Sequence, residues 1–345
     1  MATVLVDYRF GGNSAELKKL IAEVMVNESP LLQTLTFDEL TDNNVSRQKM
    51  FDVGDIQEHT VGDTWTIVNP TWDYRDAPLT ILGDNVTVDN FGDLASGQQN
   101  LMAQQIAEKA RQISRRYDKL AIYGGVTNNG ALAGSAMVGL LKHIARCEGT
   151  QSTSLASDLD GWLYTSNDSA AHNKQVVYGV ATASVAVSMA MIAALRDAVK
   201  PKATAFIMSL LMRRKVEALC QAQGTNLDVR EGKAGQIVTM LGEQKVLVNE
   251  AIKDNMPDGA SNVTNITTYD YASGTGDISP IFAVAIGDSD FTGLNGKGMI
   301  QIEDLAGGGV METLDAKGKR IKAYLGTALR KRTAAAVLLG TNYAG

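Results

Sequence analysis

The sequence predicts an α+β protein, and three patterns support this prediction. Residues 51–93 alternate apolar and polar side chains and are enriched in Thr, Val, Ile and Trp, which is typical of strands joined in a long hairpin. Residues 95–122 repeat an apolar side chain every three or four positions, which is typical of one long helix with a buried stripe. Beyond residue 200, helical patterns alternate with short apolar runs that indicate strands.

The N-terminal region is predicted to hold a helix followed by an extended arm. Asn13 can cap a helix in "NSAELKKLIAEVMVNESP", with Glu16 completing a capping box and Pro30 marking the end. The stretch "SPLLQTLTFDEL" then indicates an extended, partly apolar chain. The long helix is expected to stop at Gly124 and Gly125, because glycine favours the backbone conformation that ends a helix.

The remaining chain is predicted to alternate helices and strands. Helices are expected in "MVGLLKHIAR", "SVAVSMAMIAALRDAV" and "SLLMRRKVEALCQA". Strands are expected in "KVLVNEAI", "IFAVAIGD", "GMIQIED" and "AAAVLLGT", and a hairpin around Asp315–Gly318. The uncharged stretch Val176–Leu195 has the length of a bilayer span, but its alanines and hydroxyl side chains make it weakly hydrophobic, so a buried helix is the prediction.

No catalytic, cofactor or metal site is predicted. His143 and Cys147 are spaced to share a metal on a helix, but they make only half a site. Asp288 and Asp290 occupy calcium-loop positions, yet Met299 stands where a glutamate ligand is needed. The glycine-rich stretch 124–134 follows a helix and lacks the lysine of a phosphate loop. Two cysteines build no disulfide framework, and the N-terminus shows no signal peptide.

The charge distribution is the most informative feature of the 345-residue chain. Its net charge is −6, which does not favour a nucleic-acid-binding protein as a whole. Residues 51–93 hold nine acids and one base, a net charge of −8, whereas the long helix carries an excess of +3 from Glu108 to Lys119. An acidic hairpin and a basic helix favour docking between copies, although both could be solvated faces that never meet. The candidate contact residues are Arg111, Arg115, Arg116, Asp73, Asp76 and Trp72.

The order of these parts resembles the major capsid protein of tailed bacteriophages, whose Hong Kong 97-like fold is shared with encapsulins. "ESPLLQTLTFDEL" resembles the family's N-terminal arm, and residues 49–90 resemble its extended loop. The stretch from "DNFGDLASGQQN" to "DKLAIYGG" resembles the spine helix of the peripheral domain. "ATAFIMSLLMRRKVEAL", "KVLVNEAI" and "AVAIGDSDF" resemble segments of the axial domain.

The resemblance implies six consecutive parts. They are the N-terminal arm (1–48), the extended β-hairpin loop (49–90), the peripheral domain with its spine helix (91–145), a mixed α/β axial domain (146–298), the return strands of the peripheral domain (299–330) and a C-terminal strand of the axial domain (331–345). Some family members link subunits covalently through a lysine in the extended loop and a distant asparagine. Because no lysine lies between Lys49 and Lys109, the sequence predicts a shell without such links.

The function implied by the resemblance is that of a non-catalytic major capsid protein. It would self-assemble through hexamers and pentamers into an icosahedral shell around the double-stranded DNA genome of a tailed phage. Implied partners are further copies of itself, a separate scaffolding protein, a portal, a decoration or cement protein, and DNA bound non-specifically, with no membrane. The implied location is the virion, after assembly in the host cytoplasm. Two alternatives stay open: an encapsulin-like compartment holding an enzyme cargo, and a cytoplasmic α/β enzyme. The basic helix could also face packaged DNA.

Overall fold

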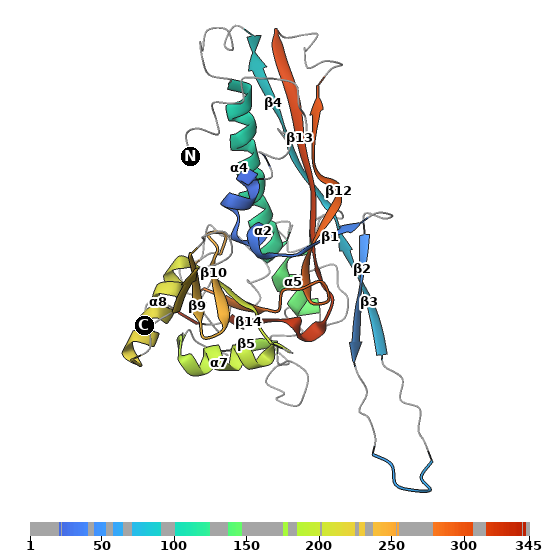
Figure 1. Ribbon diagram of the computed structural model, residues 1–345, viewed down its shortest axis with the longest axis vertical. Coiled ribbons are helices and arrows are strands. Elements are labelled where there is room, and N and C mark those ends of the chain that lie inside the picture. Colours follow the sequence, from blue (N-terminus) through green and yellow to red (C-terminus); the bar gives the residue numbers. More distant parts are fainter. Residues whose placement is uncertain are drawn as a thin grey trace, which may run out of the picture.

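An elongated sheet, a second sheet with its helices and a projecting hairpin make up this protein, seen in a computed structural model (Figure 1). The structure describes residues 21, 23–40, 45–52, 58–64, 71–90, 101–124, 137–146, 175–178, 185–200, 202–224, 228–231, 237–252, 254, 279–305, 315–339 and 341–342. The expected cap at Asn13, the stretch 125–134 and Cys147 lie outside the described residues.

The elongated sheet has four strands in the order β1-β12-β13-β4, with β1 parallel to β12 and the other pairs antiparallel. These strands are β1 (Phe37–Leu40), β12 (Phe291–Asp304), β13 (Ala316–Leu329) and β4 (Thr80–Asp89). Helix α4 (Leu101–Tyr123) lies along one face of the sheet (Figure 1). On β4, Leu82, Val86 and Val88 alternate with exposed residues, because successive strand side chains point to opposite faces. The side of β4 that carries Leu82, Val86 and Val88 is therefore the one covered by α4.

The second sheet has seven strands in the order β5-β14-β11-β7-β10-β9-β8. Their bounds are β5 (Val176–Tyr178), β14 (Ala335–Leu339), β11 (Ile281–Val284), β7 (Ala205–Met208), β10 (Gln244–Val248), β9 (Ile237–Leu241) and β8 (Asp228–Glu231). Every residue of β7, β11 and β14 is buried, which explains why these strands are continuous apolar runs in the sequence.

Short helices pack against strands of the second sheet. They are α5 (Leu140–Arg146), α7 (Met189–Ala198) and α8 (Leu210–Ala222), with a 3-10 turn η4 (Arg332–Ala334) before β14. Ser188 and Ser209 cap α7 and α8 by accepting hydrogen bonds from Met191 N and Met212 N. The short strands β6 (Val185–Ala186) and β15 (Thr341–Asn342) pair in parallel.

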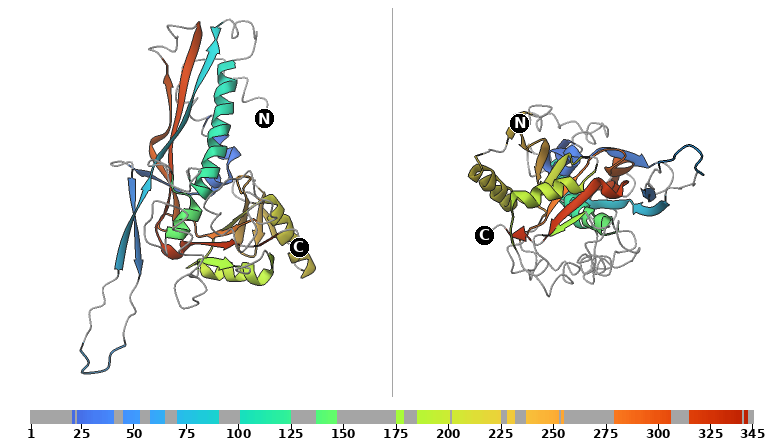
Figure 2. Two further views of the ribbon diagram at one scale, coloured as in Figure 1. Left: turned by 180° about the vertical axis from the view of Figure 1, so that it is seen from behind. Right: turned by 90° about the horizontal axis from the view of Figure 1, so that it is seen from below.

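The hairpin consists of β2 (Val45–Asp52) and β3 (Thr71–Pro78), paired antiparallel over eight residues. It projects away from both sheets and from α4, and its tip is the most distant part of the chain from them (Figures 1 and 2). A two-stranded ribbon that stands away from the body has no core of its own, and isolated hairpins are marginally stable in water.

The structure corrects four sequence-based expectations about elements. The arm is not wholly extended, because Pro30–Thr34 form helix α2, capped by Ser29. Residues 80–89, assigned to the extended loop, pair with β13 in the elongated sheet. No turn lies at Asp315–Gly318, since β13 starts at Ala316 and continues to Leu329. Val176–Leu195 is not one helix: the described residues include β5, β6 and the start of α7.

Candidate inter-subunit surfaces

The exposed side of α4 carries the three predicted arginines, because its apolar stripe faces the sheet. Ile106, Ile113 and Tyr117 are buried, whereas Arg111, Arg115 and Arg116 are exposed. Arg111 Nη1 lies 3.2 Å from Glu108 Oε2, one helical turn earlier. Arg116 makes no ion pair within the part of the chain that the structure describes. The surface is therefore less uniformly basic than the sequence suggests.

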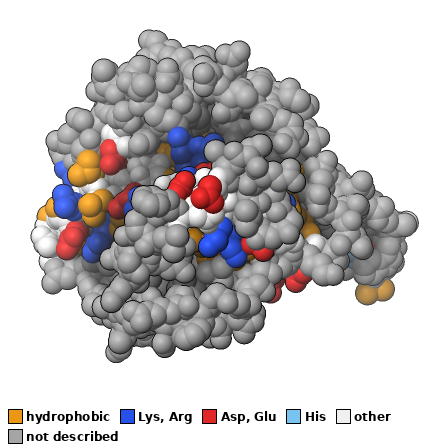
Figure 3. Space-filling view, turned by 90° about the horizontal axis from the view of Figure 1, so that it is seen from above, with side chains coloured by type: hydrophobic (Ala, Val, Ile, Leu, Met, Phe, Trp, Pro, Cys, Tyr) orange, Lys and Arg blue, Asp and Glu red, His pale blue; other side chains and the backbone are white. Residues whose placement is uncertain are grey.

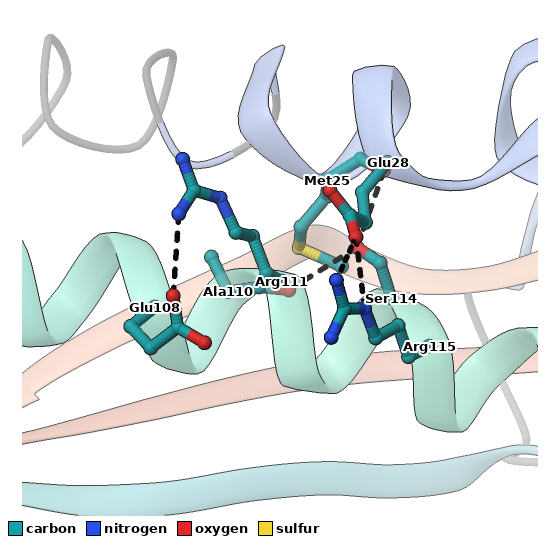
Figure 4. A network of polar contacts seen from close by, with 7 residues as sticks. All are labelled: Met25, Glu28, Glu108, Ala110, Arg111, Ser114 and Arg115. Atoms are coloured by element: carbon teal, nitrogen blue, oxygen red, sulfur yellow. Dashed lines mark hydrogen bonds and ion pairs between the residues drawn. The ribbon is translucent and has the colours of Figure 1, made fainter.

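Arg115 is bound within its own chain. Its Nη2 and Nε atoms lie 2.7 Å and 2.8 Å from Glu28 Oε1 (Figure 4). The hydrogen bond from Arg115 to Glu28 is the main cause of the raised pKa of this guanidinium. Glu28 belongs to a helical stretch, residues 23–28, that lies across α4, and Ser114 Oγ donates to Met25 O at 3.2 Å in the same contact. No local pattern indicates this pairing, because Glu28 and Arg115 are 87 positions apart.

Lys109 also has an acidic partner in the same chain. Its Nζ donates to Asp84 Oδ2 at 2.5 Å, joining α4 to β4. This hydrogen bond and a second from the Asn85 backbone lower the pKa of the Asp84 carboxyl. Asp84 was counted among the acids of the extended loop, but β4 places it beside the helix. Part of the opposite charge is therefore neutralised within the subunit.

The hairpin itself is only mildly acidic. Its strands hold three acids, Asp52, Asp73 and Asp76, and three bases, Arg47, Lys49 and Arg75. From residue 45 to 78 there are six acids and three bases, a net charge of −3. The range 51–93 has a net charge of −8 because it omits Arg47 and Lys49 and includes Asp84, Asp89 and Asp93, which lie beyond the hairpin. The hairpin also contains a lysine, since Lys49, the first residue of the predicted extended loop, lies within β2.

The remaining predicted contact residues lie on β3. The ladder places Trp72 opposite Phe51, Asp73 opposite Met50 and Asp76 opposite Arg47. Within one chain the hairpin points away from α4, so these residues are not brought to the arginines (Figures 1 and 2). Any meeting of the two surfaces requires a second copy.

The hairpin tip is an ordered turn that presents one apolar side chain. Asp63 Oδ2 accepts from Thr60 N at 2.8 Å and from Thr60 Oγ1 at 2.6 Å. Both hydrogen bonds lower the pKa of Asp63, and the bond from the Thr60 side chain has the larger effect. Gly62 has φ of 102°, a conformation that other residues rarely adopt. Val61, next to Gly62, is fully exposed at the tip, and no pattern in the sequence indicates this exposure.

The weaker sequence motifs have structural roles. His143 is buried, with Nε2 3.1 Å from Thr327 O. Arg330 Nη1 donates to Asp288 O at 2.6 Å, and Lys331 Nζ donates to Asp290 Oδ1 at 2.7 Å, so the acidic turn before β12 is held by bases that follow β13. Among the described residues, no group of three metal-ligating side chains occurs, and no described helix is long and apolar enough to cross a bilayer. On the described surface seen from above, acidic and basic side chains are interspersed (Figure 3).

An elongated sheet backed by a long helix, a second mixed sheet and a projecting hairpin together define the Hong Kong 97-like fold. Solved structures share it along nearly the whole chain. The encapsulin complex holo-SrpI from Synechococcus elongatus is similar with a TM-score of 0.58 at 12% identity, covering 91% of this chain and 88% of that one. The capsid of a native GTA particle has a TM-score of 0.56 at 12% identity, covering 90% of both chains. Mycobacterium phage Adephagia has a TM-score of 0.51 at 13% identity, covering 90% and 89%.

The chain therefore has the fold of phage capsid and encapsulin shell proteins, as the sequence predicted. No protein-family model matches the sequence, and no curated protein matches it. The likeness is thus one of fold at very low identity.

Proposed function

We propose that this protein is a structural shell subunit that self-assembles into a closed icosahedral particle. The observation that carries the proposal is the projecting hairpin of β2 and β3 on a Hong Kong 97-like body. Its two strands pair only with each other, and an isolated two-stranded ribbon is marginally stable, so the hairpin is suited to contact another chain. The proposed role is non-catalytic and uses no cofactor.

The particle that we favour is the capsid of a tailed phage, built of hexamers and pentamers around double-stranded DNA. Scaffolding, portal and decoration proteins would be separate partners of that capsid. The alternative is an encapsulin-like compartment, supported by the similarity to the encapsulin complex with a TM-score of 0.58. A cytoplasmic α/β enzyme is disfavoured by the fold.

Expression of the full chain followed by size-exclusion chromatography and negative-stain imaging tests shell formation. Closed particles support the proposal, and a monomer or small oligomer at all concentrations contradicts it. The contents of native particles distinguish the two kinds of shell. The particles are isolated from their source, treated with nuclease and then opened. Protected double-stranded DNA supports a capsid, and a single enriched enzyme supports a compartment.

We further propose that the exposed side of α4 meets the hairpin of a neighbouring copy. The support is geometric: Arg116 is exposed on α4, and the hairpin extends away from the α4 of its own chain. The charge argument is smaller than the sequence implied, because Arg115, Arg111 and Lys109 already have acidic partners in the chain. We favour Arg116 with Asp73 as the inter-subunit pair, because Asp73 stands opposite the uncharged Met50 in the ladder.

A further inference from the structure

A buried carboxyl group lies where three distant parts of the chain meet. Asp118 is on the inner side of α4 and is 6% exposed. Ser29, at the start of α2, contacts it from the N-terminal region, and Asn249, just after β10, approaches it from the seven-stranded sheet. The residue thus joins the N-terminal segment, the long helix and the second sheet. We call residues 23–34, which contain the helical stretch and α2, the N-terminal segment.

Hydrogen bonds tie this carboxyl to the backbone of its neighbours. Ser29 Oγ donates to Asp118 Oδ1. The Ser29 Oγ atom also accepts a hydrogen bond from Leu32 N at 3.1 Å, which caps α2. Asn249 Oδ1 accepts from Ala251 N at 2.8 Å and fixes the turn after β10. Asp118 is therefore bonded directly to the residue that caps α2, and it lies beside the residue that fixes a turn of the second sheet.

The junction is incompletely satisfied. Asn249 Nδ2 and the Tyr117 hydroxyl are buried without a hydrogen-bond partner among the described residues. The Asn249 amide lies near enough to lower the pKa of Asp118, although no hydrogen bond of normal geometry joins them. Unsatisfied buried donors cost free energy, so this joint is less firmly held than a fully paired core.

No cation neutralises the carboxyl among the described residues. The N-terminal segment brings Glu28, a like charge that is itself paired with Arg115. The turn after β10 brings the acid Glu250 near Arg115, and α4 itself contributes the buried Tyr117. Burial raises the pKa of Asp118 to about 7, with Glu28 adding to the rise, while the hydrogen bond from Ser29 and the nearby Asn249 amide oppose it. Burial also raises the pKa of Tyr117, which therefore stays neutral.

We propose that Asp118 is a proton-dependent latch that holds the N-terminal segment against α4 and the seven-stranded sheet. When the carboxyl is protonated, it fits the buried site and keeps its hydrogen bond with Ser29. When it is ionised, it has no counter-ion and faces Glu28, so the contact weakens. The latch is firm in acid and loosens as the pH rises. This inference concerns one chain and does not depend on what the shell encloses.

The pH window follows from linkage between proton binding and opening. Opening exposes the carboxyl to water and so returns its pKa toward the ordinary value of 3.8, and between that value and about 7 the closed state holds a proton that the open state has lost. The opening constant should therefore rise about tenfold per pH unit within this window and level off above its upper end.

Hydrogen exchange of the full chain from pH 5 to pH 8.5 tests the latch, with rates corrected for the chemical pH dependence of amide exchange. Peptides covering residues 23–34 should show this rise and plateau. Asp118→Asn should remove the pH dependence and leave the segment protected throughout. Glu28→Gln should move the plateau to lower pH, because it removes a like charge and releases Arg115.

Glu108→Gln is the matched control, since Glu108 is an exposed acid on the same helix and pairs with Arg111 instead. Its profile should equal that of the wild type. A flat wild-type profile, or an Asp118→Asn profile that keeps the wild-type slope, would overturn the latch. If Asp118→Asn does not fold, the wild-type curve and the direction of the Glu28→Gln shift still decide.

Discussion

Arg115 and Arg116 are neighbours on α4. Of these two, Arg115 has an acidic partner among the described residues and Arg116 has none. Reversing the charge at Arg116 should therefore leave the subunit folded and reduce the yield of shells. Arg115→Glu should instead place a like charge beside Glu28 and loosen the N-terminal segment. Thermal unfolding and particle yield, measured for both variants, separate these effects.

Rescue of Arg116→Glu by charge reversal on the hairpin identifies the partner. Asp73→Arg should restore more assembly than Asp76→Arg, because Asp76 stands opposite Arg47 in the ladder and Asp73 stands opposite Met50. Empty shells that form normally but retain no nucleic acid would show that Arg116 faces packaged DNA. Unchanged assembly and unchanged retention would mean that the exposed side of α4 is merely solvated.

A second residue-scale prediction concerns Gly139, where the chain enters α5. A Cβ atom there would lie 2.2 Å from Gly124 N and 2.4 Å from Tyr123 C, which are backbone atoms that cannot rotate away. Gly139→Ala should therefore destabilise the subunit by roughly 1–3 kcal/mol, measured by denaturant unfolding. In Gly287→Ala the Cβ would make only an ordinary 3.4 Å contact with Asp290 Oδ2, so its stability should stay within about 0.5 kcal/mol. Equal losses in the two variants would contradict this account.

At the scale of elements, the boundary between hairpin and sheet falls at Leu79. Strands β2 and β3 pair with each other and contact β13 only near their base at Ala77, whereas residues 80–89 are hydrogen bonded to β13 and covered by α4. In unassembled subunits, amides of β2 and β3 should exchange rapidly and those of β4 that bond to β13 slowly. Assembly should protect the hairpin as well. Core-like protection of β2 and β3 in a monomer would contradict its role as an inter-subunit element.

The same boundary explains why the sequence placed β4 wrongly. Its alternation of apolar and polar residues matches that of a hairpin strand, since both are half-buried. Periodicity reports that one face is covered but not what covers it. The covering helix comes later in the chain, and the strand that pairs with β4 begins at Ala316. No local signal in residues 80–89 points to either.

For the whole molecule, we expect particles that are held together without covalent links. The described tip of the hairpin, residues 58–64, contains no lysine, and Lys49 lies within β2, opposite Tyr74. Cys220, the free cysteine of the described residues, is buried in α8, and burial raises its pKa, which disfavours the reactive thiolate. Denatured particles should run as a single band at the subunit mass of 36.8 kDa. A ladder of multimers would contradict this expectation, and sensitivity of that ladder to reductant would identify disulfides.

The sequence by itself determined the class of fold, the long helix and most strands, because these depend on local patterns of apolar residues and on caps such as Ser209. It also determined which side of α4 is exposed, since the position of the buried stripe fixes the position of the arginines. The tertiary structure decided which charges are available. Only packing brings together three pairs of residues that are far apart in the chain. These pairs are Glu28 and Arg115, Asp84 and Lys109, and Ser29 and Asp118. A carboxyl group has the same chemistry in any sequence, and its surroundings in the fold decide whether it pairs with a base or is buried without a counter-ion.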